Sequence, residues 1–101
     1  MPNKDRLPPI HPGEILREEF LAPLGMSSHA LALALRVPAT RVNDIVNEKR
    51  GITADTALRL ARYFGTTSRF WMNMQASWEL EVAEDQLSKT VRREVLPRTA
   101  A

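Results

Sequence analysis

Apolar side chains recur every three or four positions along most of the chain, which is the spacing of amphipathic helices. Pro12 stands at a plausible first helical position before GEILREEFLA, in which Leu16 and Phe20 lie four residues apart. Pro23 and Gly25 follow this segment, and both residue types interrupt helices. The pattern predicts a first helix that begins at Pro12 and is stopped by Pro23 and Gly25.

The next apolar segment, HALALALRV, fits either a strand or a helix, because its leucines alternate with alanines. A helix is favoured, since Ala and Leu are strong helix formers and no β-branched residue occurs before Val37. Ser27 or Ser28 can cap this second helix. Pro38 is then expected to open a third helix, which ends near Asn47.

Two further helices and two terminal segments complete the pattern. Thr53 can cap ADTALRLARYF before the stop at Gly65, and Thr67 or Ser68 can cap RFWMNMQASWELEVAEDQL. Five helices without a convincing strand predict an all-α fold. The expected organisation is an extended Pro-rich arm over residues 1–10, one domain over residues 11–88, and a basic, flexible tail over residues 89–101.

Composition narrows the class of protein. A chain of 101 residues has room for one domain, and 44% hydrophobic with 26% charged residues is typical of soluble globular proteins. No apolar run approaches the roughly 18 residues of a membrane span, and the N-terminus lacks the apolar stretch of a signal peptide. We therefore expect a cytoplasmic protein without a membrane partner. The absence of cysteine excludes disulfides, thiolate nucleophiles and cysteine-based zinc sites.

Charge is distributed unevenly along the chain, although the formal net charge is only +2. Residues 36–50 carry Arg36, Arg41, Lys49 and Arg50 against two acids. Residues 79–85 carry four acids and no base. These runs predict one basic and one acidic side of the molecule, and a basic side suits a polyanionic partner.

The second and third predicted helices, joined by RVPA, have the spacing of a helix-turn-helix. A helix fits the major groove of DNA if its inner side is apolar and its outer side carries hydrogen-bonding groups. Val42, Ile45 and Val46 supply the inner side. The outer side carries Thr40, Arg41, Asn43 and Asp44.

Arg41 is the strongest candidate for reading a base, because its guanidinium can donate two parallel hydrogen bonds to guanine. Asn43 could pair with adenine or face solvent, and Asp44 could accept from cytosine or hold Arg41 in place. Phosphate contacts that set the register are expected from Ser28, His29, Asn47, Lys49 and Arg50. The alternative interpretation is a solvated polar surface, since helix-turn-helix geometry also occurs in proteins that bind nothing.

The sequence offers few side chains that could form a catalytic site or bind a metal. Ser28 and His29 are neighbours in sequence and would not face each other on a helix. His11 and Glu14 could touch a metal together, yet two possible ligands do not make a site. The sequence predicts neither an enzyme nor a bound cofactor or metal.

Three segments resemble the HigA antitoxin family, within the Xre or lambda-repressor-like class of helix-turn-helix proteins. They are HPGEILREEFLAPLGMS, LALALRVPATRVNDIVNEKRGIT and DTALRLARYFGTTSRFWMNMQ, which follow the family in order and spacing over roughly residues 11 to 80. The resemblance implies a five-helix lambda-repressor-like domain in a homodimer that binds a palindromic operator and represses its own operon. It also implies inhibition of a HigB-type toxin, a ribosome-dependent messenger RNA ribonuclease.

The family's recognition helix falls on residues 38–47, which adds Ala39 to the expected base-reading positions. Two residues depart from the family pattern: Arg36 stands where glycine is frequent, and Pro38 where a serine or threonine cap is common. A left-handed backbone at Arg36 would cost about 1 kcal/mol, and its charge would favour a nearby phosphate.

The fifth predicted helix carries more large apolar surface than a small core easily hides, which predicts a dimer interface. Its candidate residues are Phe70, Trp71, Met74 and Trp78. Trp71 and Trp78 could instead pack inside the monomer. A two-fold dimer would place its recognition helices about 34 Å apart, one turn of DNA. Two other functions stay open, a stand-alone Xre-type regulator without a toxin and a protein-interaction module with a vestigial helix-turn-helix.

Overall fold

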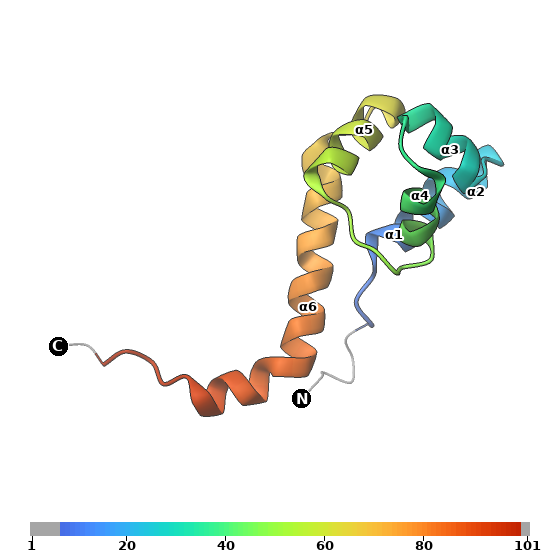
Figure 1. Ribbon diagram of the computed structural model, residues 1–101. Coiled ribbons are helices and arrows are strands. Elements are labelled where there is room, and N and C mark those ends of the chain that lie inside the picture. Colours follow the sequence, from blue (N-terminus) through green and yellow to red (C-terminus); the bar gives the residue numbers. More distant parts are fainter. Residues whose placement is uncertain (1–6, 100–101) are drawn as a thin grey trace.

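The computed structural model describes residues 7–99, and within this range the chain forms helices and no strand (Figure 1). The first helical segment has three consecutive parts, followed by four separate helices. They are α1 (Pro12–Ile15), the π-helical η1 (Leu16–Leu21), α2 (Ala22–Leu24), α3 (Ser28–Leu35), α4 (Ala39–Val46), α5 (Ala54–Phe64) and α6 (Ser68–Glu94). With the first three parts taken as one helix, the predicted all-α, five-helix fold is confirmed.

The first helix does not stop at Pro23, contrary to the prediction. Its middle part is π-helical, and the N–H of Ala22 donates to the carbonyl of Arg17, five residues back. The wider π turn leaves room for the proline ring, which would collide with the preceding turn of an α-helix. The helix ends at Gly25, the second of the two predicted stops, whose left-handed backbone (φ 60°) suits glycine.

Side-chain caps begin three of the other helices as predicted. Ser27, Thr53 and Thr67 each accept a hydrogen bond from a backbone N–H three residues further on, at 3.0, 3.4 and 3.1 Å. Pro38 differs slightly from its predicted place, because it takes the N-cap position and Ala39 is the first helical residue of α4. No side chain caps α4.

The core lies where α1 to α5 and the start of α6 converge, and the helical spacing predicted most of it. Its fully buried side chains include Leu16, Leu31, Val42, Ile45, Leu60 and Trp71. Gly13 allows two helices to approach closely, since a Cβ at this position would lie 1.8 Å from the carbonyl oxygen of Ile45. The start of α1 therefore rests directly on the backbone of α4.

The long helix α6 belongs only partly to this core. Trp71 and Gln75 are buried, whereas Leu80, Leu87 and Val91 are exposed where α6 leaves the bundle (Figure 1). The radius of gyration is 17.0 Å, against about 13 Å for a compact chain of 100 residues. The molecule thus has a compact helical head, formed by α1 to α5 and the start of α6, and a projecting stem, formed by the rest of α6.

The predicted tail is wrong over residues 89–94, which continue α6 to Glu94. No glycine or proline interrupts the chain before Pro97, so nothing in the local sequence ends the helix earlier. Residues 95–99 have no regular structure. At the other end, residues 7–10 have no regular secondary structure, and residues 1–6 of the expected arm lie outside the described residues.

Candidate nucleic-acid interface

The helix-turn-helix is formed by α3, α4 and a turn that closes without glycine. Arg36 ends α3 in the left-handed conformation (φ 60°, ψ 45°), as its replacement of a glycine suggested. The N–H groups of Arg36 and Val37 donate to carbonyls of the last turn, those of Leu33 at 3.3 Å and Ala32 at 3.1 Å. These bonds give hydrogen-bond donors to two carbonyl groups at the end of α3 and set the direction in which α4 begins.

One face of α4 is apolar and the opposite face is polar, as predicted. Val42, Ile45 and Val46 are buried in the common core. Thr40, Asn43, Asp44 and Asn47 follow the three-and-four spacing of one helix face, and only Asp44 of these is partly covered. Ala39 is exposed at the start of the helix. Three of the five expected base-reading residues therefore lie on one outward strip, and Ala39 precedes them at the exposed start of α4.

Arg41 lies at the flank of this strip and is held from α5. Its Nη1 donates to Oδ2 of Asp55 at 2.6 Å, while the other oxygen of Asp55 accepts from Nε of Arg59 at 3.0 Å. Arg59 in turn donates to the carbonyl of Leu35 at 2.9 Å. Arg59 and Arg41, in that order of effect, hold the pKa of Asp55 below its usual value. A hydrogen-bonded chain thus joins α3, α4 and α5.

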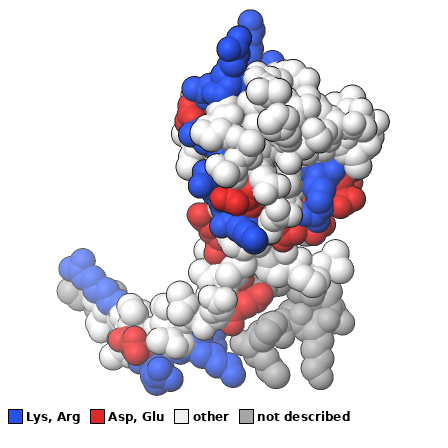
Figure 2. Space-filling model, turned by 45° about the vertical axis from the view of Figure 1, so that its right-hand side comes forward, with Lys and Arg blue, Asp and Glu red and all other residues white. Residues whose placement is uncertain are grey.

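The alternative that Asp44 holds Arg41 is wrong, because Asp44 faces Arg50 at 3.6 Å instead. Helix α5 brings Asp55 to Arg41 across the fold, and sequence spacing gave no sign of this contact. Figure 2 shows basic and acidic side chains next to each other on one face of the molecule.

The C-terminal end of α4 is held by Arg17, a residue that no sequence pattern marked as functional. The guanidinium of Arg17 donates to the carbonyl of Val46 and also contacts Glu48 at 3.4 Å. A hydrogen bond with Glu18 contributes most to holding the pKa of Arg17 above its ordinary range, followed by Glu48. Arg17 thereby ties the C-terminal end of α4 to the first helix.

The loop after α4 is attached to α6 through one buried amide. Gln75 accepts a hydrogen bond from the N–H of Ile52 at 2.7 Å and donates to Glu79 at 2.9 Å. A Cβ at Gly51 would lie 2.6 Å from the Gln75 side chain, so the loop packs tightly there. This contact fixes the loop that carries Lys49.

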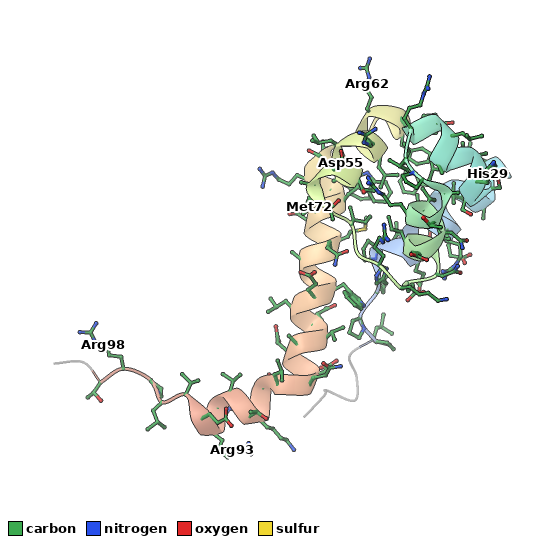
Figure 3. All side chains as sticks on the ribbon, viewed as in Figure 1. His29, Asp55, Arg62, Met72, Arg93 and Arg98 are labelled. Atoms are coloured by element: carbon green, nitrogen blue, oxygen red, sulfur yellow. The ribbon has the colours of Figure 1, made fainter. Side chains whose placement is uncertain are left out.

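The residues expected to contact phosphate lie at both ends of the helix-turn-helix and in its turn. Asn47, Lys49 and Arg50 are exposed after α4, and Arg36 is exposed in the turn. At the start of α3, His29 is exposed and Ser28 is partly covered. Figure 3 shows His29 at the outer end of α3, well apart from Asp55 at the start of α5.

His11 serves packing and capping in the structure. It is buried, its Nδ1 accepts the N–H of Gly13 at 2.9 Å, and its ring meets Trp78 edge-on with centroids 4.7 Å apart. Burial lowers the pKa of His11, which Glu48 partly offsets. Among residues 7–99, no group of three or more His, Asp or Glu side chains could hold a metal ion.

Trp71 is a core residue, so its predicted place in a dimer interface is wrong. It is fully buried within the monomer, and its Nε1–H donates to Thr66 at 2.8 Å. Phe70 is 38% exposed, whereas Met74 and Trp78 are half-buried. A mainly apolar groove of about 570 Å³ separates the N-terminal segment from α6. It is lined by Leu7, Pro8, Ile10, Ile15, Phe70, Asn73, Met74, Ser77 and Glu81.

Within residues 7–99, no helix has both the length and the apolar character needed to span a membrane. A family model described as helix-turn-helix matches residues 16–71. Virulence-associated protein I of Dichelobacter nodosus is 62% identical over 81 residues, which cover 80% of this chain and 75% of that protein. Antitoxin HigA-1 of Vibrio cholerae is 39% identical over 77 residues, or 76% of this chain and 72% of the relative.

Two solved structures resemble this one closely over nearly their full lengths. The Pseudomonas aeruginosa antitoxin HigA with the higBA promoter has 53% identity and a TM-score of 0.87, covering 90% of this chain and 99% of that one. Antitoxin GraA in complex with its operator has 44% identity and a TM-score of 0.87, covering 98% of this chain and 100% of that one.

Proposed function

Since this chain belongs to the HigA antitoxins of the helix-turn-helix family, we propose that it represses its own operon by binding operator DNA and neutralises a HigB-type toxin. The observation that carries the DNA-binding part is the outward polar strip of α4, held on an apolar inner face by α3 and α5. The relatives that are solved with promoter or operator DNA share this fold. The function is binding rather than catalysis.

In this proposal the start of α4 enters the major groove. Thr40, Asn43 and Asp44 meet base edges from the outward strip, Ala39 allows close approach, and Arg41 reads guanine from the flank. A short polar side chain suits a helix that must lie deep in the groove. Sequence preference should therefore respond most to changes at these positions.

Phosphate contacts on either side of α4 set the register. Exposed Asn47, Lys49 and Arg50 follow α4, while Ser28, His29 and Arg36 lie at the two ends of α3. Such contacts contribute affinity but carry no sequence information directly. Their loss should weaken binding to all duplexes alike and reduce its salt dependence.

We further propose that the active form is a homodimer built around the apolar groove beside α6. Phe70 and Met74 line this groove, and Trp78 follows one turn later on the same helix. The exposed apolar residues of the projecting part of α6 extend the available surface. A two-fold dimer would present two copies of α4 about 34 Å apart to one palindromic site.

Operator binding can be tested by footprinting the DNA upstream of the chain's own gene and measuring affinity over a salt series. A protected palindrome and a steep loss of affinity with salt are expected. Arg41→Ala should reduce sequence preference more than Lys49→Ala does, because the lysine contacts phosphate. No shift of this DNA at low salt would refute the DNA-binding proposal.

Toxin neutralisation is tested separately by co-expression with the neighbouring gene. A stable complex of the two products without ribonuclease activity is expected in the cytoplasm, where the operator and ribosomes are located. Free ribonuclease activity in the mixture would contradict it. An unrelated neighbour together with normal operator binding would indicate a stand-alone regulator.

A further inference from the structure

Arg41 is the only candidate base reader of α4 that the structure ties to another helix by an ion pair in the described residues. Its side chain is 29% exposed, and Asp55 engages one terminal nitrogen, Nη1, at 2.6 Å. A guanidinium has five N–H donors in a rigid fork, and bidentate recognition of guanine needs two of them. One carboxylate contact therefore leaves enough donors to read a base.

Asp55 is itself held in place from the opposite side. Its second oxygen accepts from Arg59 at 3.0 Å, and Arg59 is bonded to the carbonyl of Leu35 at 2.9 Å. This chain of hydrogen bonds thus starts at the carbonyl of Leu35, at the C-terminal end of α3, the first helix of the helix-turn-helix. It ends at the guanidinium on the second helix.

We propose that Asp55 is a specificity-determining positioning residue that orients Arg41 toward a guanine of the operator. This inference rests on the proposed DNA-binding function. A long arginine side chain loses rotamer freedom when it meets a base, and a guanidinium oriented beforehand loses less. The two arginines that keep the pKa of Asp55 low also keep its carboxylate charged for this task.

Stability alone gives a poor reason for this network, because ion pairs between exposed side chains contribute little to folding. Asp55 is also unfavourable for DNA binding in general, since a carboxylate near the interface repels phosphates. The proposal therefore makes two predictions of opposite sign. Removing the charge of Asp55 should weaken base discrimination and strengthen binding to unrelated DNA.

The test uses the full chain and duplexes carrying the footprinted site, with each G·C pair of a half-site replaced in turn. Arg41→Ala should abolish the preference for one guanine over the other bases, a preference of roughly 5- to 100-fold in the wild type. Asp55→Asn should remove part of this factor at the same guanine, while affinity for an unrelated duplex rises. In the Arg41→Ala background, Asp55→Asn should change this preference no further.

Glu48→Gln is the matched control, because it removes one negative charge at the opposite end of α4, where Glu48 contacts Arg17. It should leave the guanine preference unchanged. Arg59→Lys is a second variant. It keeps the positive charge but loses the planar guanidinium that bonds both Asp55 and the carbonyl of Leu35. It should weaken the same preference even if Asp55→Asn is unstable.

The proposal is overturned if Asp55→Asn changes affinity for every duplex of the series by the same factor. It is equally overturned if the loss persists in the Arg41→Ala background, or if Arg41→Ala keeps every base preference. These results differ from a failure of the proposed function, in which the wild-type chain itself would show no preference for the operator.

Discussion

Gly13 is the residue at which one added methyl group meets the hardest obstacle. A Cβ there would overlap the carbonyl oxygen of Ile45, a backbone atom that cannot rotate away. We expect Gly13→Ala to lower the free energy of unfolding by about 1–3 kcal/mol or more. Gly65→Ala is the comparison, since a Cβ at Gly65 meets nothing within 4 Å and only its left-handed backbone costs about 1 kcal/mol. Urea unfolding should rank Gly13→Ala as the more harmful change.

His11 should make stability depend on pH. Burial lowers its pKa below the ordinary 6.5, so the unfolded chain takes up the proton more readily than the folded one. This contribution to the free energy of unfolding is complete above about pH 6.5 and is lost as the pH falls from there toward the lowered pKa.

The His11→Asn variant should retain an acceptor for the N–H of Gly13 but lose this pH dependence. Unfolding at about pH 5 and about pH 7.5 measures the difference between the two chains. His29→Asn, at an exposed position, should behave like the wild type. An unchanged pH profile in His11→Asn would disprove the role of the buried imidazole.

At the scale of elements, Gln75 joins α6 to the loop after α4. Gln75→Ala would leave the N–H of Ile52 buried without its acceptor, at a cost of about 1–3 kcal/mol in unfolding free energy. Gln86→Ala, on the exposed part of the same helix, should stay within about 0.5 kcal/mol of the wild type. Hydrogen exchange of the Ile52 amide should be faster only in Gln75→Ala, and equal rates would contradict this role.

The sequence predicted elements whose causes are local. Ser27, Thr53 and Thr67 cap helices through bonds three residues away, and the buried faces follow helical periodicity. It did not predict contacts that depend on how helices cross, such as those of Arg41 with Asp55 and of Gln75 with Ile52. Both pairs are more than ten residues apart, so no spacing rule could identify them.

At the scale of the whole molecule, the proposed homodimer would cover the apolar groove and the exposed apolar residues of the projecting stem. Sedimentation should therefore give a mass of about twice 11.4 kDa. Ile10→Asp places a charge in the groove on an exposed residue, and it should weaken the dimer by about tenfold or more. Leu58→Asp, on exposed α5 away from the groove, should leave the mass unchanged. A wild-type monomer at micromolar concentration would rule out this dimer.

The different settings of the two tryptophans give the protein two built-in fluorescent reporters. Trp71 is sealed in the core beside Thr66, so its emission should be blue-shifted and should change only when the head unfolds. Trp78 lies against the ring of His11, and a protonated imidazole quenches indole emission on contact. In a Trp71→Phe variant, a fall in fluorescence on acidification would follow the protonation of one histidine without any label.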